Sequence, residues 1–126
     1  MLAIGLMSGT SLDGVDVSLV EIKQNNSKFH YLEVASLFIP YEDDLKQRIL
    51  ECSDLKKSNV QKICSLNFEL GHIYKDAVDK MLELEKLTSD DIEFIAMHGQ
   101  TIWHNPEEMD GYFSSTLQIG EPSILA

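Results

Sequence analysis

The stretch Leu2–Ile22, with the sequence LAIGLMSGTSLDGVDVSLVEI, decides how this chain begins to fold. The apolar run over residues 2–7 is typical of a buried strand, and Val15–Ile22 alternates apolar and polar residues as a half-buried strand does. Turn-forming residues fill Ser8–Gly14 between them. A third strand candidate, Tyr31–Ile39, is stopped by a proline. The pattern therefore predicts an antiparallel meander.

Helical periodicity follows this meander. Glu42–Cys52 places its apolar residues on one helical face, and apolar residues recur at three- and four-residue steps over 60–82. Gly71 lies inside the longer helix, where its low helix propensity allows a slight break. Ile92–Met97 and Thr116–Gly120 have the character of two further strands. This order predicts an α/β fold in which helices cover a mixed sheet.

Length and charge limit the class of protein. The 126 residues, 44% of them hydrophobic and 25% charged, match the composition of one globular domain. Ten Lys and Arg residues against 21 Asp and Glu residues give a formal charge of −11. This acidity disfavours nucleic acid and anionic membranes as partners, because phosphate groups are bound by clustered Lys and Arg.

The sequence also indicates a compartment. No apolar stretch is long enough to suggest a membrane span, and the first residues lack the features of a signal peptide. We therefore expect a cytoplasmic protein. In that setting Cys52 and Cys64 are expected to be buried thiols, neither joined in a disulfide nor shared by a metal.

A glycine-rich cluster over Gly5–Asp16 is the first candidate site. Its glycines let the backbone approach a ligand closely, and a turn of successive backbone N–H groups can cradle an anion. Thr10 and Ser11 supply hydroxyls, while Asp13 and Asp16 could hold magnesium directly or through water. No Gly-Lys-Ser/Thr follows, which excludes a Walker P-loop. An ordinary polar turn in a glycine-rich hairpin is the alternative interpretation.

The second candidate is the segment His98-Gly99-Gln100-Thr101 at the end of the predicted strand Ile92–Met97. Ligands of open α/β sheets favour the carboxyl ends of strands. The mixed donors and acceptors of these side chains suit sugar hydroxyls or an amide. A metal site made by His98, His104 and Asp13 is conceivable, although the spacing matches no common zinc signature. A solvated or hydrogen-bonded loop histidine is the plainer interpretation.

Together three segments resemble the anhydro-N-acetylmuramic acid kinase family: Gly5–Asp16, His98–Pro106 and Thr116–Pro122. They occur in the order of the family and span nearly the whole chain. The resemblance implies the acetate and sugar kinase/heat-shock protein/actin superfamily, whose members have two lobes with a ribonuclease-H-like core in each and ATP between them. It also implies that ATP phosphorylates O6 of 1,6-anhydro-N-acetylmuramic acid, from recycled cell wall, while water opens the anhydro bridge, giving N-acetylmuramic acid 6-phosphate.

The resemblance assigns roles to individual residues. The segment that it matches to the ATP-phosphate loop comprises Gly9, Thr10, Ser11, Leu12, Asp13, Gly14, Val15 and Asp16. The residues that it matches to the sugar side are His98, Gln100 and Thr101. The expected cofactors are ATP and Mg²⁺, with Asp13 as the first choice for the metal, and the expected partners are the small-molecule sugar and ATP.

Members of the family are much longer than this chain. Their catalytic aspartate lies in an Asp-x-Arg motif followed by a Gly-Gly-Gln-Gly segment, and neither occurs here. We therefore expect residues 1–126 to be a single N-terminal domain, the first lobe of a two-lobe sugar kinase, without the adenosine-binding lobe. The general base is expected beyond Ala126, so this chain carries no catalytic residue and is inactive alone. Asp16 and Glu121 are disfavoured as bases.

Trp103 stands where family members often have a basic residue, which puts a charge role at that position in doubt. A non-catalytic glycan- or protein-binding domain of the same fold is the alternative from another functional class, and another sugar kinase of the superfamily is the alternative from the same class. Self-association, including a homodimer, is also left open.

Overall fold

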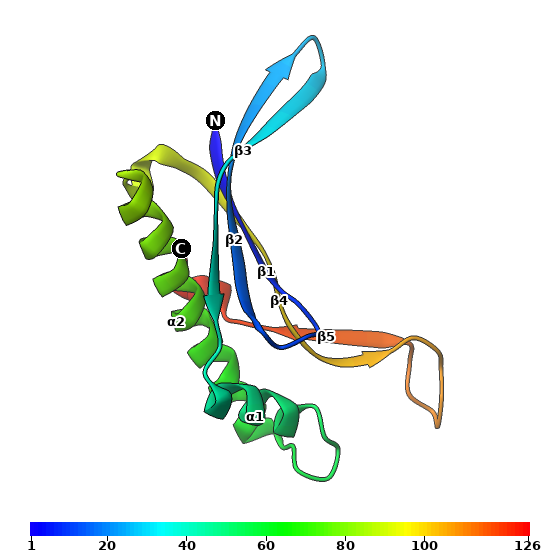
Figure 1. Cartoon of the computed structure of the whole chain (residues 1–126). Helices are drawn as coiled ribbons and strands as arrows, with labels where there is room; N and C mark the ends of the chain where they lie inside the picture. The colour runs from blue at the N-terminus through cyan, green and yellow to red at the C-terminus, as the bar shows by residue number, and fades with distance from the viewer.

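A computed structural model describes all 126 residues. The main elements in chain order are β1 (Leu2–Ser8), β2 (Gly14–Asn25), β3 (Lys28–Pro40), α1 (Asp43–Cys52), α2 (Val60–Glu85), β4 (Ile92–Asn105) and β5 (Ser115–Ile119). The strands form one five-stranded sheet in the order β3-β2-β1-β4-β5 (Figure 1). Only the β1–β4 pair is parallel. The predicted meander and mixed sheet are confirmed.

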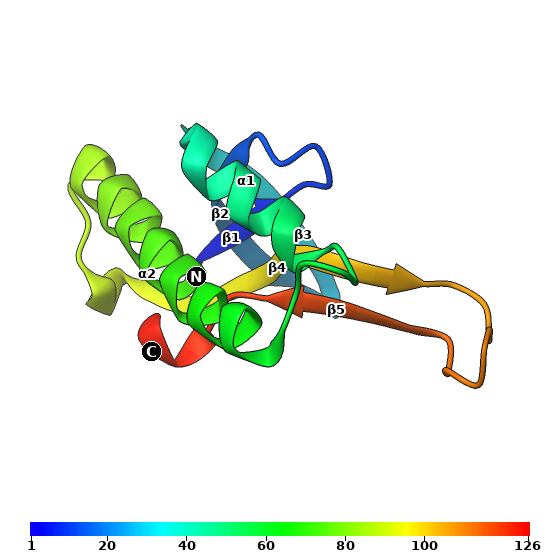
Figure 2. The ribbon, with the colours of Figure 1, turned by 90° about the horizontal axis from the view of Figure 1, so that it is seen from below.

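Both helices lie on the same side of this sheet (Figures 1 and 2). The alternation in β2 explains which side they cover, because Val15, Val17 and Leu19 are buried whereas Asp16 is exposed. These strand residues pack against the apolar stripe of α2, whose buried members include Leu66, Leu70, Tyr74, Ala77, Val78 and Met81. The helices therefore cover one face of the sheet, and the other face is open.

The long helix α2 runs without a break through Gly71, so the expected interruption is wrong. The reason for a glycine here is close packing. A Cβ atom at this position would lie 2.8 Å from the carbonyl oxygen of Glu121 and 2.9 Å from Cδ1 of Ile124. Both belong to the segment around the short 3-10 turn η2 (Pro122–Ile124), which rests on α2. Gly71 thus lets the last residues dock on the helix.

Strand β4 is longer than the sequence predicted. It continues past Met97 to Asn105, so His98, Gln100 and Thr101 lie inside the strand instead of beyond its end. Two features account for the difference: Gly99 adopts a φ of 78°, which lets the strand bend, and β5 pairs with residues 100–105. The register between β4 and β1 shifts at the same place.

Two further expectations concern cysteines and membranes. Neither cysteine forms a disulfide, and Cys52 is buried as predicted. Cys64 is exposed, so the expectation that both thiols are buried is wrong for this residue, which lies on the outer side of α2. None of the helices combines the length and the apolar character that a membrane crossing requires.

Candidate functional site

A short loop, Gly9–Asp13, joins the ends of β1 and β2 and forms the centre of the first candidate site. Its neighbour Gly14 must be a glycine, because a Cβ atom there would overlap the carbonyl oxygen of Ile39 and lie 2.8 Å from the Cα atom of Pro40. Leu12 adopts a φ of 59° and packs its side chain against the core. The loop is therefore anchored from within while its polar residues Thr10, Ser11 and Asp13 are exposed.

The loop also leaves backbone donors free. Among residues 10–13, only Leu12 donates its N–H to an acceptor within the chain, the Gly9 carbonyl oxygen at 3.3 Å. The N–H groups of Thr10, Ser11 and Asp13 have no acceptor in the protein. Free backbone N–H groups beside hydroxyls are the kinds of donor that bind an anion such as phosphate.

Gln100 connects the second sequence motif to this loop. Its side chain is completely buried, and its Nε2 atom donates to the carbonyl oxygens of Gly9 and Thr101, both at 3.3 Å. Its Oε1 atom has no hydrogen-bond partner. The pairing of β4 with β1 explains this placement, since Gln100 lies beside Ser8 in the parallel register. In this arrangement Gln100 supports the first candidate site from inside the protein.

His98 lies elsewhere, at a shallow hollow on the open face of the sheet. Asp16 and Ser18 of β2 and Gly5 and Met7 of β1 line the same hollow. The His98 Nδ1 atom is 3.1 Å from the carbonyl oxygen of Gly99. Because that oxygen can only accept, a neutral imidazole carries its hydrogen on Nδ1 and leaves Nε2 as an acceptor. The hollow is therefore lined by a carboxylate, an imidazole and the hydroxyl of Ser18, which donates to Oε2 of Glu33 at 2.9 Å.

Thr101 stands apart from both of these groups. Its side chain is half-buried, and its Oγ1 atom accepts a hydrogen bond from Nε2 of Gln118 on β5 at 3.3 Å. The three residues expected on the sugar side are thus divided between the open hollow, the interior below the loop and the β5 side of β4. Alternation along a strand, interrupted at Gly99, produces this separation.

The side chains of the candidate site make different fits to different metals. No group of three or more His, Cys, Asp and Glu side chains could hold a metal ion, so His98, His104 and Asp13 do not form the conceivable metal site. Mg²⁺ makes a smaller demand, because it is commonly held by one or two carboxylates, water and the phosphates of a substrate. Asp13, an exposed carboxylate in the loop, fits that requirement.

Glu121 is engaged in structural contacts. Its Oε1 atom accepts from the backbone N–H of Ser123 at 3.2 Å, and its Oε2 atom accepts from Nδ2 of Asn67 at 3.1 Å. Hydrogen bonds from Ser123 hold the pKa of this carboxyl below its ordinary value. A carboxylate of lowered pKa is a weaker base than an ordinary glutamate.

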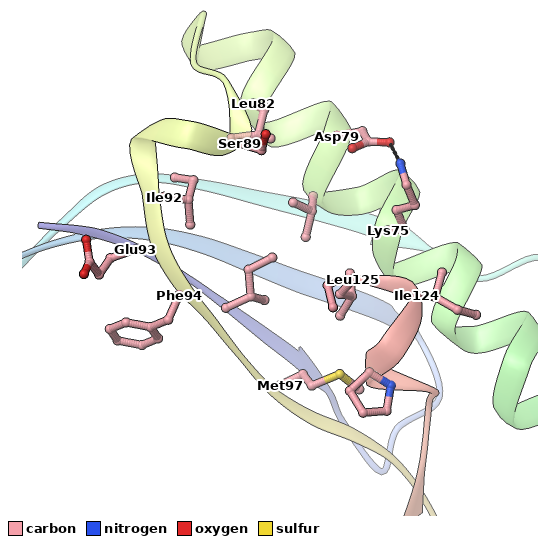
Figure 3. A pocket seen from close by; sticks show the side chains of 14 residues that line it. Lys75, Asp79, Leu82, Ser89, Ile92, Glu93, Phe94, Met97, Ile124 and Leu125 are labelled. Atoms are coloured by element: carbon pink, nitrogen blue, oxygen red, sulfur yellow. Dashed lines mark hydrogen bonds and ion pairs between the residues drawn. The ribbon is translucent and has the colours of Figure 1, made fainter.

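A wider groove lies between α2 and β4, next to the last residues of the chain (Figure 3). Apolar side chains dominate its lining, among them Leu82, Ile92 and Met97, and an ion pair between Lys75 and Asp79 at 2.5 Å lies at its side. No residue of the predicted loop or of the predicted sugar side lines it, and only Met97 is shared with the lining of the His98 hollow. The groove is therefore distinct from the candidate site.

Sequence comparison places these features in a family. The family model for anhydro-N-acetylmuramic acid kinase matches residues 1–126. Proteins named anhydro-N-acetylmuramic acid kinase are similar to the whole chain: that of Clostridioides difficile strain 630 is 41% identical over 126 residues, and that of Bacillus cereus strain ATCC 10987 is 42% identical over 128 residues. The protein of that name from Caldanaerobacter subterraneus is 43% identical over 130 residues, which cover 99% of this chain. The chain spans 33%, 33% and 32% of the length of these relatives.

Proposed function

Because this chain belongs to the anhydro-N-acetylmuramic acid kinase family, we propose that residues 1–126 act as the N-terminal domain of such a kinase. The proposed reaction joins ATP, water and 1,6-anhydro-N-acetylmuramic acid to give N-acetylmuramic acid 6-phosphate and ADP. The observation that carries the proposal is a match over the whole chain together with a loop that leaves successive N–H donors unused. A cytoplasmic location belongs to the same proposal.

The proposed role of the Gly9–Asp13 loop is to bind the phosphates of ATP. The chain has a formal charge of −11, and no Lys or Arg lies within the loop. Phosphate binding must therefore come from backbone N–H groups, from the hydroxyls of Thr10 and Ser11, and from a cation. Asp13 would hold Mg²⁺, which neutralises phosphate charge when bound. Gly14, Val15 and Asp16 continue the loop into β2 and keep its exit fixed.

The proposed sugar side is the open face of the sheet. His98 and Asp16 line one hollow there, so an imidazole acceptor and a carboxylate could orient sugar hydroxyls. Thr101 remains a candidate contact through its hydroxyl. Gln100 offers only Oε1, because its amide nitrogen is occupied by Gly9 and Thr101. In the proposed enzyme the adenosine-binding lobe and the general base come from parts of the family sequence that these residues do not include.

A kinase assay tests this function. The assay uses a chimera in which residues 1–126 are followed by the remaining two-thirds of the Clostridioides difficile relative. We call this chimera the whole-length enzyme. With ATP and magnesium it is expected to form the 6-phosphate product. Asp13→Ala is expected to lower turnover by ~10-fold or more, since metal-assisted charge stabilisation contributes several kcal/mol to such reactions. Asp76→Ala, which removes an exposed carboxylate from α2, is the control.

The outcome separates the proposal from its alternative. Unchanged turnover of Asp13→Ala at saturating magnesium, with an unaltered melting curve, contradicts the role of this residue. Absence of any product from the unsubstituted whole-length enzyme, combined with binding of the sugar, would instead indicate a non-catalytic glycan-binding domain.

A further inference from the structure

Three hydroxyl groups meet in the interior beneath the candidate phosphate loop. Ser8, the last residue of β1, directly precedes the loop. Its Oγ atom lies 2.8 Å from the hydroxyl of Tyr41 and donates to the hydroxyl of Tyr74 at 3.0 Å. All three side chains are buried, at 3%, 5% and 1% exposure respectively. The end of β1, the junction between β3 and α1, and helix α2 are therefore joined at one oxygen atom.

The ionisation of the tyrosines sets the direction of these hydrogen bonds. Burial raises the pKa of both Tyr41 and Tyr74, so both phenols keep their hydrogens at neutral pH. Ser8 has a single hydroxyl hydrogen and donates it to Tyr74. Tyr41 must therefore donate to Ser8. The chain of donors then runs from Tyr41 through Ser8 to Tyr74.

Tyr41 also reaches the other end of the loop. Its backbone N–H donates to the carbonyl oxygen of Asp13 at 2.9 Å. One residue thus bonds to the residue that precedes the loop through its side chain and to the last loop residue through its backbone. Gln100 adds a third support at the Gly9 carbonyl oxygen.

We propose that Tyr41 is a positioning residue that clamps the two ends of the Gly9–Asp13 loop in one conformation for phosphate binding, with Tyr74 bracing the clamp from α2. The proposal rests on the phosphate-binding function proposed above for this loop. Its physical basis is preorganisation. An exposed glycine-containing loop that must order itself on each binding event loses affinity, whereas donors fixed in advance do not incur that cost.

The test uses variants that remove one hydroxyl and keep the ring. In the whole-length enzyme, Tyr41→Phe is expected to raise KM for MgATP by about fivefold, the factor that one net hydrogen bond supplies. Its kcat and its KM for the anhydro sugar are expected to stay within about twofold of the parent values. Tyr74→Phe is expected to shift KM for MgATP in the same direction by a smaller factor. Tyr31→Phe, at a residue with 83% exposure, is the matched control.

KM for MgATP separates a positioning role of Tyr41 from a purely structural one. A purely structural tyrosine would lower the melting temperature and the active fraction without moving KM for MgATP, so an unchanged KM in Tyr41→Phe overturns the proposal. If Tyr41→Phe does not fold, Tyr74→Phe decides by the same criterion. If Asp13→Ala lowers turnover or raises KM for MgATP while Tyr41→Phe changes neither, the positioning role of Tyr41 is wrong and the proposed function stands. If neither Asp13→Ala nor Tyr41→Phe changes turnover or KM for MgATP, both the proposed function and the positioning role are wrong.

Discussion

Replacing Gly120 with alanine is expected to destabilise the domain strongly. This residue follows β5 with a φ of 134°, a backbone conformation that is essentially restricted to glycine. An added Cβ atom would overlap Cε2 of Tyr74 and lie 3.1 Å from Cε of Met97. The backbone cannot move away freely, because the Gly120 N–H donates to Oδ1 of Asn67 at 2.7 Å.

Two separate effects contribute to the loss in free energy of unfolding that we expect for Gly120→Ala. The unfavourable φ costs roughly 1–3 kcal/mol. Overpacking against a buried aromatic ring costs roughly 1–3 kcal/mol more. The free energy of unfolding is therefore expected to fall by about 2–6 kcal/mol in Gly120→Ala. A domain of this length has a total of roughly 6–19 kcal/mol at 0.05–0.15 kcal/mol per residue, so the variant loses a large share of its stability.

Urea unfolding of the 126-residue chain, followed by circular dichroism, measures this loss. Gly111→Ala is the matched control, because Gly111 has a φ of 82° with no atom within 4 Å of the added Cβ. That control measures the cost of a positive φ without overpacking, roughly 1–3 kcal/mol. Equal losses in the two variants would refute the argument that the Tyr74 ring blocks a side chain at position 120.

Three other results are expected. His98→Ala in the whole-length enzyme should raise KM for the anhydro sugar and leave KM for MgATP unchanged; the reverse shift would show that the two substrate positions are exchanged. Hydrogen bonds from Arg48 hold the pKa of the Glu69 carboxyl below its ordinary value. The Arg48–Glu69 pair therefore stabilises the fold at pH values above the ordinary glutamate pKa, and this contribution is lost as the pH falls through the lowered pKa. Because the side chains of Arg48 and Glu69 are 40% and 39% exposed, Glu69→Gln should cost only about 0.5 kcal/mol at pH 7. In a series of thermal melts at falling pH, the difference from the parent should shrink and vanish once the pH is below the lowered pKa of Glu69. The 126-residue chain alone should form no 6-phosphate product with ATP and magnesium, and product at the rate of the whole-length enzyme would show that residues 1–126 suffice for catalysis.

The elements of this fold were predictable where periodicity is clear. The alternation of Val15, Val17 and Leu19 indicates one face of a strand, and the stripe along 60–82 indicates a buried helix face. The predicted break at Gly71 does not occur, because helix propensity does not report that a distant segment, Glu121–Ile124, packs against this position. The extension of β4 was missed because its polar residues resemble a loop until β5 is paired with them.

The candidate site divides in the same way. The glycine-rich loop could be recognised from residues close together in sequence. The residues that support that loop could not be recognised from the sequence. Tyr41 follows a proline and belongs to no local pattern, and Tyr74 is indistinguishable from the other apolar residues of the α2 stripe. Only the folded chain brings their hydroxyls to Ser8. The burial of Gln100 likewise depends on the parallel pairing of β1 and β4, which no local signal specifies.

The hydrogen bonds around the loop also imply an order of folding. They span increasing distances along the chain: 33 residues from Ser8 to Tyr41, 66 from Ser8 to Tyr74, and 91 from Gly9 to Gln100. Long-range contacts form late, because closing a long stretch of chain costs entropy before any contact repays it. We therefore expect a nascent chain to form the β1–β2 hairpin early and to complete the supports of the loop only after β4 has emerged and paired with β1. The proposed phosphate-binding loop would then gain all of its supports only when the domain around it is complete.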